Sequence, residues 1–194
     1  MLHSLRNYIN RITSSTISDE EFKYVEAAFK MKTLKKRQFL LHEGSVCKFM
    51  SFIINGAMRQ YHIDDKGNEH IISFGIEEWW ISDRGSFTNL TPSRYNIDAI
   101  EDTNLLVTTR DEINSLKERS PLFLKMAHIL DENSFIASQK RVEATISYTA
   151  EEKFIYLMET NPVFVKRFPQ NMLASYLGIT PETLSRVRKS LLGK

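Results

Sequence analysis

The chain lacks the features that mark several large classes of protein. Its 194 residues contain one cysteine, Cys47, which excludes an intrachain disulfide framework and a four-thiolate iron–sulfur cluster within one chain. No apolar run is long enough to cross a bilayer, and the first ten residues lack the apolar core of a signal peptide. We therefore expect a soluble, cytoplasmic protein.

Glycine and proline are scarce as well, with seven and five residues, and no internal repeat or low-complexity tract occurs. Because 42% of the residues are hydrophobic, the chain can bury real cores and is not expected to be disordered. Its length suits one large domain, or a medium domain with a small one attached.

The formal net charge of +2 hides an uneven distribution of charge along the chain. Residues 162–194 hold six Lys or Arg against one acidic residue, a net of +5, whereas residues 1–161 hold twenty basic and twenty-three acidic residues, a net of −3. A basic end on a mildly acidic body is typical of a nucleic-acid-binding module.

The basic end has the pattern of two short helices joined by a tight turn. The first helix has apolar residues at helical spacing, namely Leu173, Ala174 and Leu177. Gly178 follows, where a sharp turn needs a residue that tolerates positive φ, and Ile179 fills the corner. Thr180 suits an N-cap and Pro181 the first position of the second helix.

The second helix separates an apolar face from a polar and basic one. Its inward residues are Leu184, Val187 and Leu191, and its outward residues are Glu182, Thr183, Ser185, Arg186, Arg188 and Lys189. This is the pattern of a helix-turn-helix whose second helix reads the major groove. A helical hairpin that only caps a domain is the alternative, but the joint register of turn and apolar residues favours the DNA-binding interpretation.

The middle of the chain has the pattern of an all-β structure. Short runs with period-two alternation predict strands over residues 38–41, 49–54, 57–63, 69–74, 93–99 and 104–109. Turn signals separate them, including Asn55-Gly56 and the segment 64–68. Many short, regularly spaced strands predict a sandwich or barrel of the jelly-roll kind.

The segment 75–92 interrupts these strands and is too long for a hairpin turn. Long ordered loops in compact domains are often functional, and this one carries Trp79, Trp80, Arg84, Ser86 and Phe87. The alternative is that the two tryptophans simply plug the mouth of the barrel.

Helices are predicted on both sides of the strands. Residues 1–12 are amphipathic, and Ser18 with Glu21 has the pattern of a capping box. Ser120-Pro121 predicts the start of a long helix that reaches about Ser147 and carries an apolar stripe, which we expect to pack on the barrel and on a second copy of the chain. Thr149 with Glu152 predicts a further capping box. Segment 162–168 is apolar and alternating, so it could form a wing strand.

A barrel, a long helix and a C-terminal helix-turn-helix, in that order, resemble the Crp/Fnr family of bacterial transcription regulators. The resemblance implies an α+β fold with an N-terminal double-stranded β-helix (jelly-roll) sensor domain over residues 1–119, a dimerisation helix over 120–147 and a winged helix-turn-helix domain over 148–194. It implies a homodimer that binds double-stranded DNA at a near-palindromic operator, with RNA polymerase as a further partner.

The family's recognition pattern maps onto residues 180–186. Glu182 and Arg186 match it and by resemblance would read base edges, the glutamate accepting from cytosine and the arginine donating to guanine. Pro181 replaces the pattern's first arginine, so we expect a different operator. Thr180, Thr183 and Ser185 complete the predicted face, and by position three further residues are predicted phosphate contacts, namely Gln170, Arg188 and Lys189.

The ligand-binding pattern of the family is not matched. Members that bind cyclic nucleotides carry Phe-Gly-Glu and Arg-Ser-Ala, whereas this chain has residues 79–82, Trp-Trp-Ile-Ser, and Ser93-Arg94-Tyr95. Arg94 is one step out of register, which turns a strand side chain to the opposite face. We therefore expect no cyclic AMP binding and no required cofactor. An aromatic pocket for another effector would use Trp79, Trp80, Arg84, Ser86, Phe87, Arg94 and Tyr95.

Enzymatic chemistry is not predicted. The histidines are His3, His42, His62, His70 and His128, and they form no His-x-His metal motif. Haem ligation by Cys47 or a histidine is a weaker interpretation still, and neither a Gly-rich phosphate loop nor a nucleophile elbow occurs. The main alternative to a DNA-binding regulator is a small-molecule sensor that acts through protein partners without binding DNA.

Overall fold

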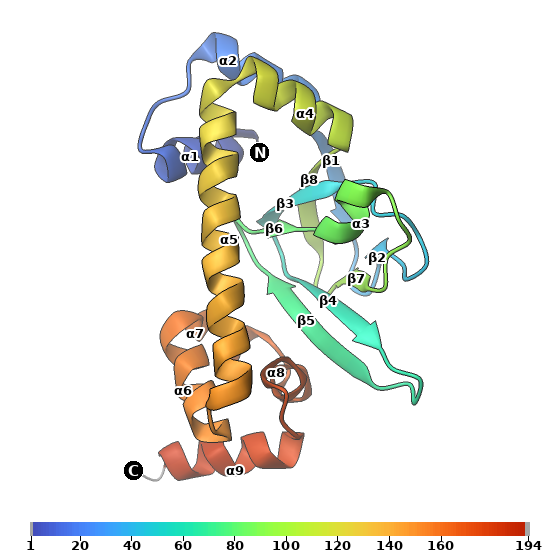
Figure 1. The fold of residues 1–194 in the computed structure, drawn as a ribbon, viewed down its shortest axis with the longest axis vertical. Coiled ribbons are helices and arrows are strands. Elements are labelled where there is room, and N and C mark those ends of the chain that lie inside the picture. Colours follow the sequence, from blue (N-terminus) through green and yellow to red (C-terminus); the bar gives the residue numbers. More distant parts are fainter. Residues whose placement is uncertain (1, 193–194) are drawn as a thin grey trace. The chain divides into compact units, whose positions relative to one another are not determined.

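The computed structural model describes residues 2–192, with Leu192 described by its backbone alone, and these residues form two compact units (Figure 1). The first unit contains the described residues up to Ile63 together with Ile72–Glu132. The second contains Asp64–Ile71 together with the described residues from Asn133 onward.

The strands form two four-stranded sheets, which confirms the predicted jelly roll. Their bounds are β1 Lys30–Leu34, β2 Phe39–Leu41, β3 Met50–Asn55, β4 Met58–Ile63, β5 Glu69–Gly75, β6 Trp80–Ile81, β7 Asn96–Ala99 and β8 Thr103–Thr108. One sheet has the order β1-β8-β3-β6 and the other β2-β7-β4-β5. The antiparallel pairs β1–β8 and β4–β7 join strands far apart in sequence, as a jelly roll requires.

Three parts of the strand prediction were wrong or incomplete. Strand β1 was missed because it is a largely exposed edge strand without a clear apolar alternation. The segment 75–92 is not a loop throughout, because it contains β6 and the short helix α3 Arg84–Asn89. Strand β7 begins at Asn96 rather than Ser93, since the Ser93 hydroxyl pairs with Asp83 and with the Tyr95 backbone instead.

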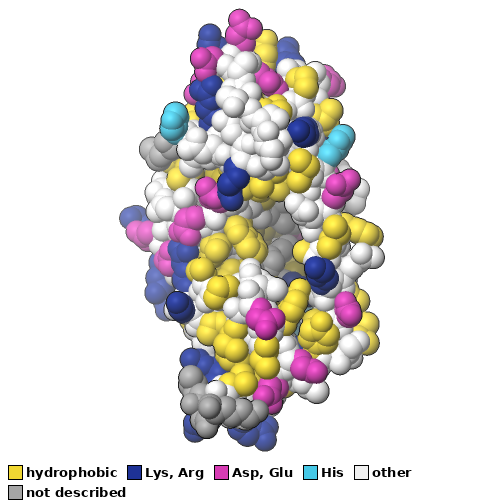
Figure 2. Space-filling view, turned by 90° about the vertical axis from the view of Figure 1, so that its left-hand side faces the viewer, with side chains coloured by type: hydrophobic (Ala, Val, Ile, Leu, Met, Phe, Trp, Pro, Cys, Tyr) yellow, Lys and Arg dark blue, Asp and Glu magenta, His cyan; other side chains and the backbone are white. Residues whose placement is uncertain are grey.

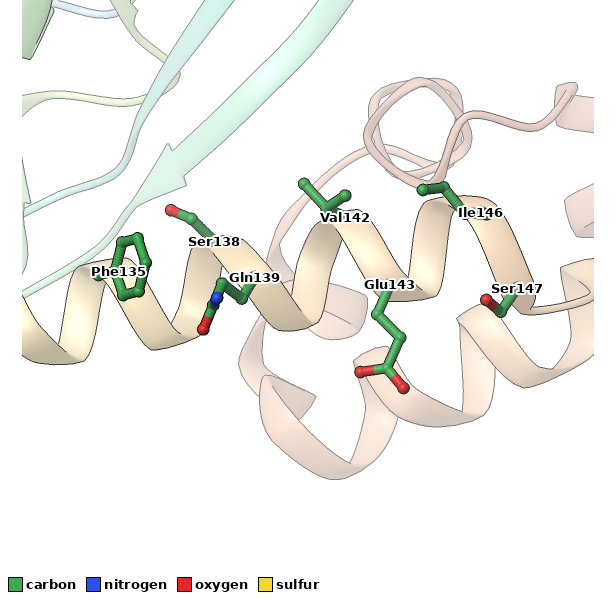
Figure 3. Close-up of a pocket in the computed structure, with 7 residues that line it drawn as sticks. All are labelled: Phe135, Ser138, Gln139, Val142, Glu143, Ile146 and Ser147. Atoms are coloured by element: carbon green, nitrogen blue, oxygen red, sulfur yellow. The ribbon is translucent and has the colours of Figure 1, made fainter.

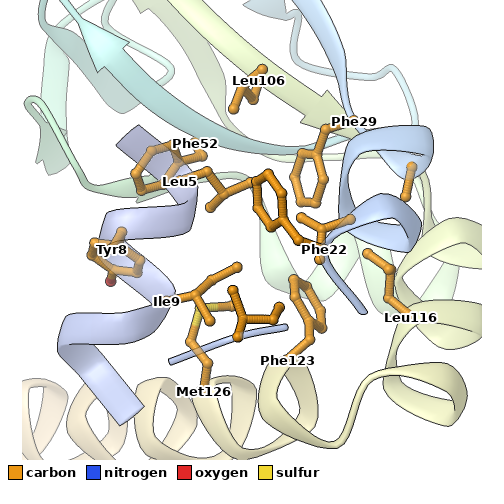
Figure 4. Packing of buried hydrophobic residues seen from close by; sticks show 13 residues of the cluster. Leu5, Tyr8, Ile9, Phe22, Phe29, Phe52, Leu106, Leu116, Phe123 and Met126 are labelled. Atoms are coloured by element: carbon orange, nitrogen blue, oxygen red, sulfur yellow. The ribbon is translucent and has the colours of Figure 1, made fainter. Parts of the chain in front are cut away.

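The first unit contains two clusters of buried hydrophobic residues. One lies between the strands and includes Ile53, Met58, Phe87, Ile97 and Leu105. The other lies where helices cover the outside of the sheet (Figure 4), and it joins residues of four helices to Phe52 and Leu106 from β3 and β8. The apolar face of the amphipathic N-terminal helix is buried in this second cluster.

Besides α3 and the start of the long helix, the first unit contains α1 Leu2–Thr13, α2 Asp19–Ala28 and α4 Arg110–Arg119. Helix α4 was not predicted; a capping box of Thr109 and Glu112 starts it. At α2 the predicted capping box is only half formed. Ser18 accepts from the Glu21 N–H, but the Glu21 carboxylate accepts instead from the Ser120 hydroxyl and from the Leu122 N–H. Glu21 therefore joins α2 to the start of the long helix.

The long helix is α5 Pro121–Ser147, as the sequence predicted, and the Ser120 hydroxyl caps it by accepting from the Phe123 N–H at 3.1 Å. It is followed by α6 Ala150–Thr160, α7 Pro162–Arg167, α8 Gln170–Leu177 and α9 Pro181–Leu192. The predicted Thr149–Glu152 capping box is present at α6.

The wing prediction for segment 162–168 was wrong, because residues 162–167 form helix α7 with proline at its first turn. Its Phe164 is 1% exposed and packs edge to face on Phe168, with ring centroids 5.1 Å apart. The apolar run thus fills the helical core of the second unit. Within residues 2–192, none of the helices combines the length and apolar character that crossing a bilayer requires.

Candidate functional site

The turn between α8 and α9 has the geometry that the sequence predicted. Gly178 adopts φ 67°, in the left-handed region that glycine tolerates, and the Ile179 N–H donates to the Ala174 carbonyl at 3.0 Å. Leu173, Ala174 and Leu184 are fully buried. Helices α8 and α9 therefore form a packed helix-turn-helix.

A chain of hydroxyl and guanidinium contacts runs along the outward face of α9. The Thr180 hydroxyl accepts from the Thr183 N–H at 3.2 Å and lies 3.1 Å from the Thr183 hydroxyl. The Arg186 Nη2 donates to the same Thr183 hydroxyl at 3.3 Å. These contacts hold the exposed Arg186 side chain along the helix surface rather than against a core.

Glu182 stands beside these residues as an ionised carboxylate. Its own backbone N–H at the start of α9 and the Thr180 hydroxyl hold the pKa of Glu182 below its ordinary value, and the positive charge of Arg186 adds to the effect. An ionised carboxylate only accepts hydrogen bonds, which matches the exocyclic amine of cytosine.

Two of the three predicted phosphate-contact residues, Gln170 and Arg188, connect α8 to α9. Arg188 Nη1 donates to Gln170 Oε1 at 3.4 Å, and Gln170 Nε2 donates to the Pro181 carbonyl at 3.4 Å. Lys189 is exposed and Ser185 is half-buried on α9. The structure thus brings the predicted DNA-binding residues of α8 and α9 together on one helix-turn-helix.

The aromatic residues of the predicted effector pocket are not brought together. Trp80 packs into the cluster outside the sheet, with its ring centroid 5.2 Å from that of Phe52 and 6.0 Å from that of Phe29. Phe87 lies in the cluster between the strands, and Trp79 is exposed. The predicted pocket, which also included Tyr95, does not bring these rings together, because β6 and α3 direct Trp80 and Phe87 to different clusters and Trp79 is exposed.

The polar residues of that predicted pocket have other partners. Arg84 Nη2 lies 2.7 Å from Asp131 Oδ1 on α5. Ser86 accepts from the Cys47 N–H at 2.8 Å and donates to the Thr91 carbonyl. Arg94 is exposed and Tyr95 is half-buried, and both precede β7, so the predicted strand register does not apply to Arg94.

Asp83 is a buried residue of this region that sequence reasoning missed. Its carboxylate caps α3 by accepting from the Ser86 N–H at 3.2 Å, and it accepts from the Ser93 hydroxyl at 2.7 Å. The N-cap pattern of an aspartate before a short helix was the signal that could have found it.

A second buried acid, Asp98, forms a bidentate pair with Arg59, with Nε to Oδ1 at 2.8 Å and Nη2 to Oδ2 at 3.1 Å. The pair joins β4 to β7, and the Arg59 guanidinium lies 4.1 Å from the Tyr61 ring. Because the two buried side chains bond to each other across β4 and β7, we assign the Arg59–Asp98 pair a structural role.

The histidines and the cysteine that were considered as metal or haem ligands have other contacts. His70 Nε2 lies 2.9 Å from Asp64 Oδ2, and His62 Nδ1 lies 3.3 Å from the Arg94 carbonyl. Cys47 is buried, and burial raises the pKa of its thiol. Within residues 2–192, no three His, Cys, Asp or Glu side chains gather as a metal site would require.

A further candidate site is an apolar groove of about 450 Å³ on α5 (Figure 3). Its lining residues are Phe135, Ser138, Gln139, Val142, Glu143, Ile146 and Ser147. All seven come from this one helix. Phe135, Val142 and Ile146 are 64%, 58% and 79% exposed, and Figure 2 shows hydrophobic side chains exposed among charged ones on one face of the molecule.

Comparison with known proteins agrees with this fold. Residues 31–120 match the family model of the cyclic nucleotide-binding domain. The chain is 24% identical to the transcriptional activator protein Anr of Pseudomonas aeruginosa over 167 residues, which cover 80% of this chain and 68% of Anr.

Two solved structures share the fold. FixK2 from Bradyrhizobium japonicum superposes with a TM-score of 0.70 at 18% identity, over 85% of each chain. The c-di-GMP-responsive global regulator CLP of Xanthomonas campestris gives 0.69 at 12% identity, over 91% of this chain and 92% of CLP.

In this chain a cyclic nucleotide-binding domain is followed by a long helix and a helix-turn-helix. The chain is therefore similar in sequence and in fold to transcription regulators that carry such a domain, among them Anr and FixK2.

Proposed function

We propose that this regulator is a homodimer that recognises a near-palindromic operator through α9. The observation that carries the proposal is the exposed face of α9, where Arg186 is held by Thr183 next to the ionised Glu182. A guanidinium donor and a carboxylate acceptor, one helical turn apart, suit the edges of guanine and cytosine in the major groove.

The contacts of α8 with α9 support a separate role in binding the DNA backbone. Gln170 bonds to both the Pro181 carbonyl and Arg188, so it holds the start of α8 beside α9. We assign Gln170, Arg188 and Lys189 to phosphate contacts, which position a protein on the duplex without selecting a base sequence.

The exposed stripe on α5 supports the dimer. Phe135, Val142 and Ile146 follow the spacing of a helix seam, with Gln139 in register between them. Large apolar side chains this exposed on one helix face are typical of a surface that another chain covers. A second copy places the same stripe opposite and brings two recognition helices to successive major grooves.

The sensor part of the proposal excludes cyclic AMP as the effector. Arg94, the arginine closest to the family's phosphate-binding position, is exposed, and Trp80 packs against a hydrophobic cluster. No cofactor is required in this proposal. RNA polymerase is the further partner that regulation of transcription implies.

The test is selection of duplexes from a randomised pool by wild-type protein and by the Arg186→Ala variant. We expect wild type to recover a defined sequence, and Arg186→Ala to lose preference at one base position of each half-site with a cost of about 1–3 kcal/mol. Lys189→Ala should weaken all sequences alike and reduce the salt dependence of binding.

Retention of the full base preference by Arg186→Ala would contradict the assigned role of that arginine. Recovery of no sequence by the wild-type protein would favour the alternative function, a small-molecule sensor that acts through protein partners.

A further inference from the structure

At one edge of β5, side chains rather than another strand form hydrogen bonds with the backbone. Among the described strands β5 is the last in the order β2-β7-β4-β5. The Ser175 hydroxyl of α8 accepts from the Ile71 N–H at 2.9 Å and donates to the Glu69 carbonyl at 2.9 Å. Arg141 of α5 donates to the Ile71 carbonyl at 3.5 Å. We call these three hydrogen bonds the edge clasp.

The edge clasp lies entirely within the second unit, which includes Asp64–Ile71. The Arg141 guanidinium also lies 4.4 Å from the ring of Tyr176, the residue after Ser175, and Tyr176 packs edge to face on Phe164 at 6.1 Å. The clasp is therefore attached to the packed core around α8, so the segment 64–71 and α8 are held together.

The segment that the clasp fastens is an ordered acidic turn. Residues 64–71 carry three carboxylates, Asp64, Asp65 and Glu69, against one lysine, Lys66. The Asp64 carboxylate accepts from the N–H groups of Lys66 and Asn68 at 2.9 and 2.8 Å. A hydrogen bond from His70 is the largest of the contacts that hold the pKa of Asp64 below its ordinary value. The turn thus has a fixed shape and an excess of negative charge.

We propose that the edge clasp is an autoinhibitory contact that weakens DNA binding while it is closed. The inference rests on the proposed function. In a helix-turn-helix the first helix, here α8, crosses the DNA backbone. The clasp fastens to α8 the backbone of a segment that carries three carboxylates, and α8 is the helix that must approach phosphates. Like charges repel. Release of the clasp frees the acidic turn to move away from α8 and raises the affinity for DNA.

The experiment compares wild type, Ser175→Ala and Ser175→Thr on a duplex recovered by wild-type protein from the randomised pool. Ser175→Ala removes two bonds of the clasp, and we expect it to bind about fivefold more tightly or better at low salt. The gain should shrink as salt screens the carboxylates. Ser175→Thr keeps a hydroxyl and should bind like wild type. Hydrogen exchange should show faster exchange of the Ile71 amide in Ser175→Ala alone.

Ser115→Ala is the matched control, because Ser115 is exposed on α4 in the first unit. The double variant Asp65→Asn/Glu69→Gln removes charge but leaves the backbone contacts of the clasp in place, and it too should bind more tightly. Unchanged or weaker binding by this double variant overturns the proposal, as does unchanged binding by Ser175→Ala. Recovery of no duplex by wild type overturns the proposed function and this inference together, so the two failures are distinguishable.

Discussion

The two halves of α5 differ in what covers their apolar side chains, although one continuous helix carries both. In the first half Phe123 and Met126 are 2% and 1% exposed, because α1 and α2 pack over them in the cluster of Figure 4. In the second half Phe135, Val142 and Ile146 are 64%, 58% and 79% exposed (Figure 3).

This difference shows that an apolar stripe has two possible uses on one helix. Where helices of the same chain lie over the stripe, it belongs to the folding core. Where the stripe continues beyond them, exposed apolar area is a cost in water that a partner removes. In the proposed dimer the first half of α5 stabilises the sensor unit, and the second half joins two copies.

The largest expected effect comes from Phe123→Ala in the buried half. Removing a fully buried phenyl ring leaves a cavity and should lower the free energy of unfolding by about 3–5 kcal/mol. Denaturant unfolding followed by circular dichroism measures it. A loss below about 1 kcal/mol would mean that the first half of α5 is not part of the core.

The next effect comes from Ile146→Glu in the exposed half. A carboxylate in the seam of the proposed dimer lies opposite its own copy and is desolvated, so the dimer dissociation constant should rise about 100-fold or more. Folding of the single chain should change little, because Ile146 is 79% exposed. Sedimentation velocity measures the association state.

Ala137→Glu is the matched control for the seam. Ala137 is also exposed, and the 3.6-residue repeat places it on the opposite side of α5 from Phe135. It should leave association unchanged. Equal association of wild type and Ile146→Glu would remove the distinction between the two halves of the helix.

The smallest expected effect concerns the melting temperature at acid pH and the capping box of α6, the helix that follows the exposed half of α5. The Thr149 backbone N–H and hydroxyl hold the pKa of Glu152 below the ordinary glutamate value of 4.5. A carboxyl whose pKa is lower in the folded state contributes stability above its unfolded pKa, and this contribution is lost as pH falls through the folded pKa. Glu152→Gln should therefore reduce the fall in melting temperature below about pH 4.5.

Glu112 in the Thr109 capping box is the counterpart in the first unit, with its pKa lowered by the Thr109 N–H. Glu112→Gln should have the same direction of effect. Hydrogen exchange resolved by segment should place the effect of Glu112→Gln at α4 and the effect of Glu152→Gln at α6. An identical acid dependence in wild type and both variants would show that these capping boxes do not contribute.

The helix-turn-helix could be predicted from sequence because its signals are local. Gly178, the Thr180 cap and Pro181 each act within a few residues, so their meaning does not depend on the rest of the fold. The jelly-roll strands were likewise visible as alternation with period two. In both cases residues close together in the sequence determine which local structure forms.

The fate of the tryptophans could not be predicted, because it depends on residues far away in sequence. Trp80 packs on Tyr8 and Phe29, and nothing near position 80 shows that those helices would cover this sheet. Segment 162–168 failed for a different reason: its alternating apolar residues fit a strand, but proline at the first turn favours helix α7. Tertiary packing decided the position of Trp80, whereas a local signal decided the structure of segment 162–168.

The most direct test of the central claim is the arrangement of the sites that wild-type protein selects from a randomised duplex pool. A dimer that presents two copies of α9 should enrich two inverted half-sites whose centres lie about one helical turn apart, 10–10.5 base pairs, with two chains bound per duplex. A single unrepeated motif bound by one chain, or no enriched sequence, would contradict the account.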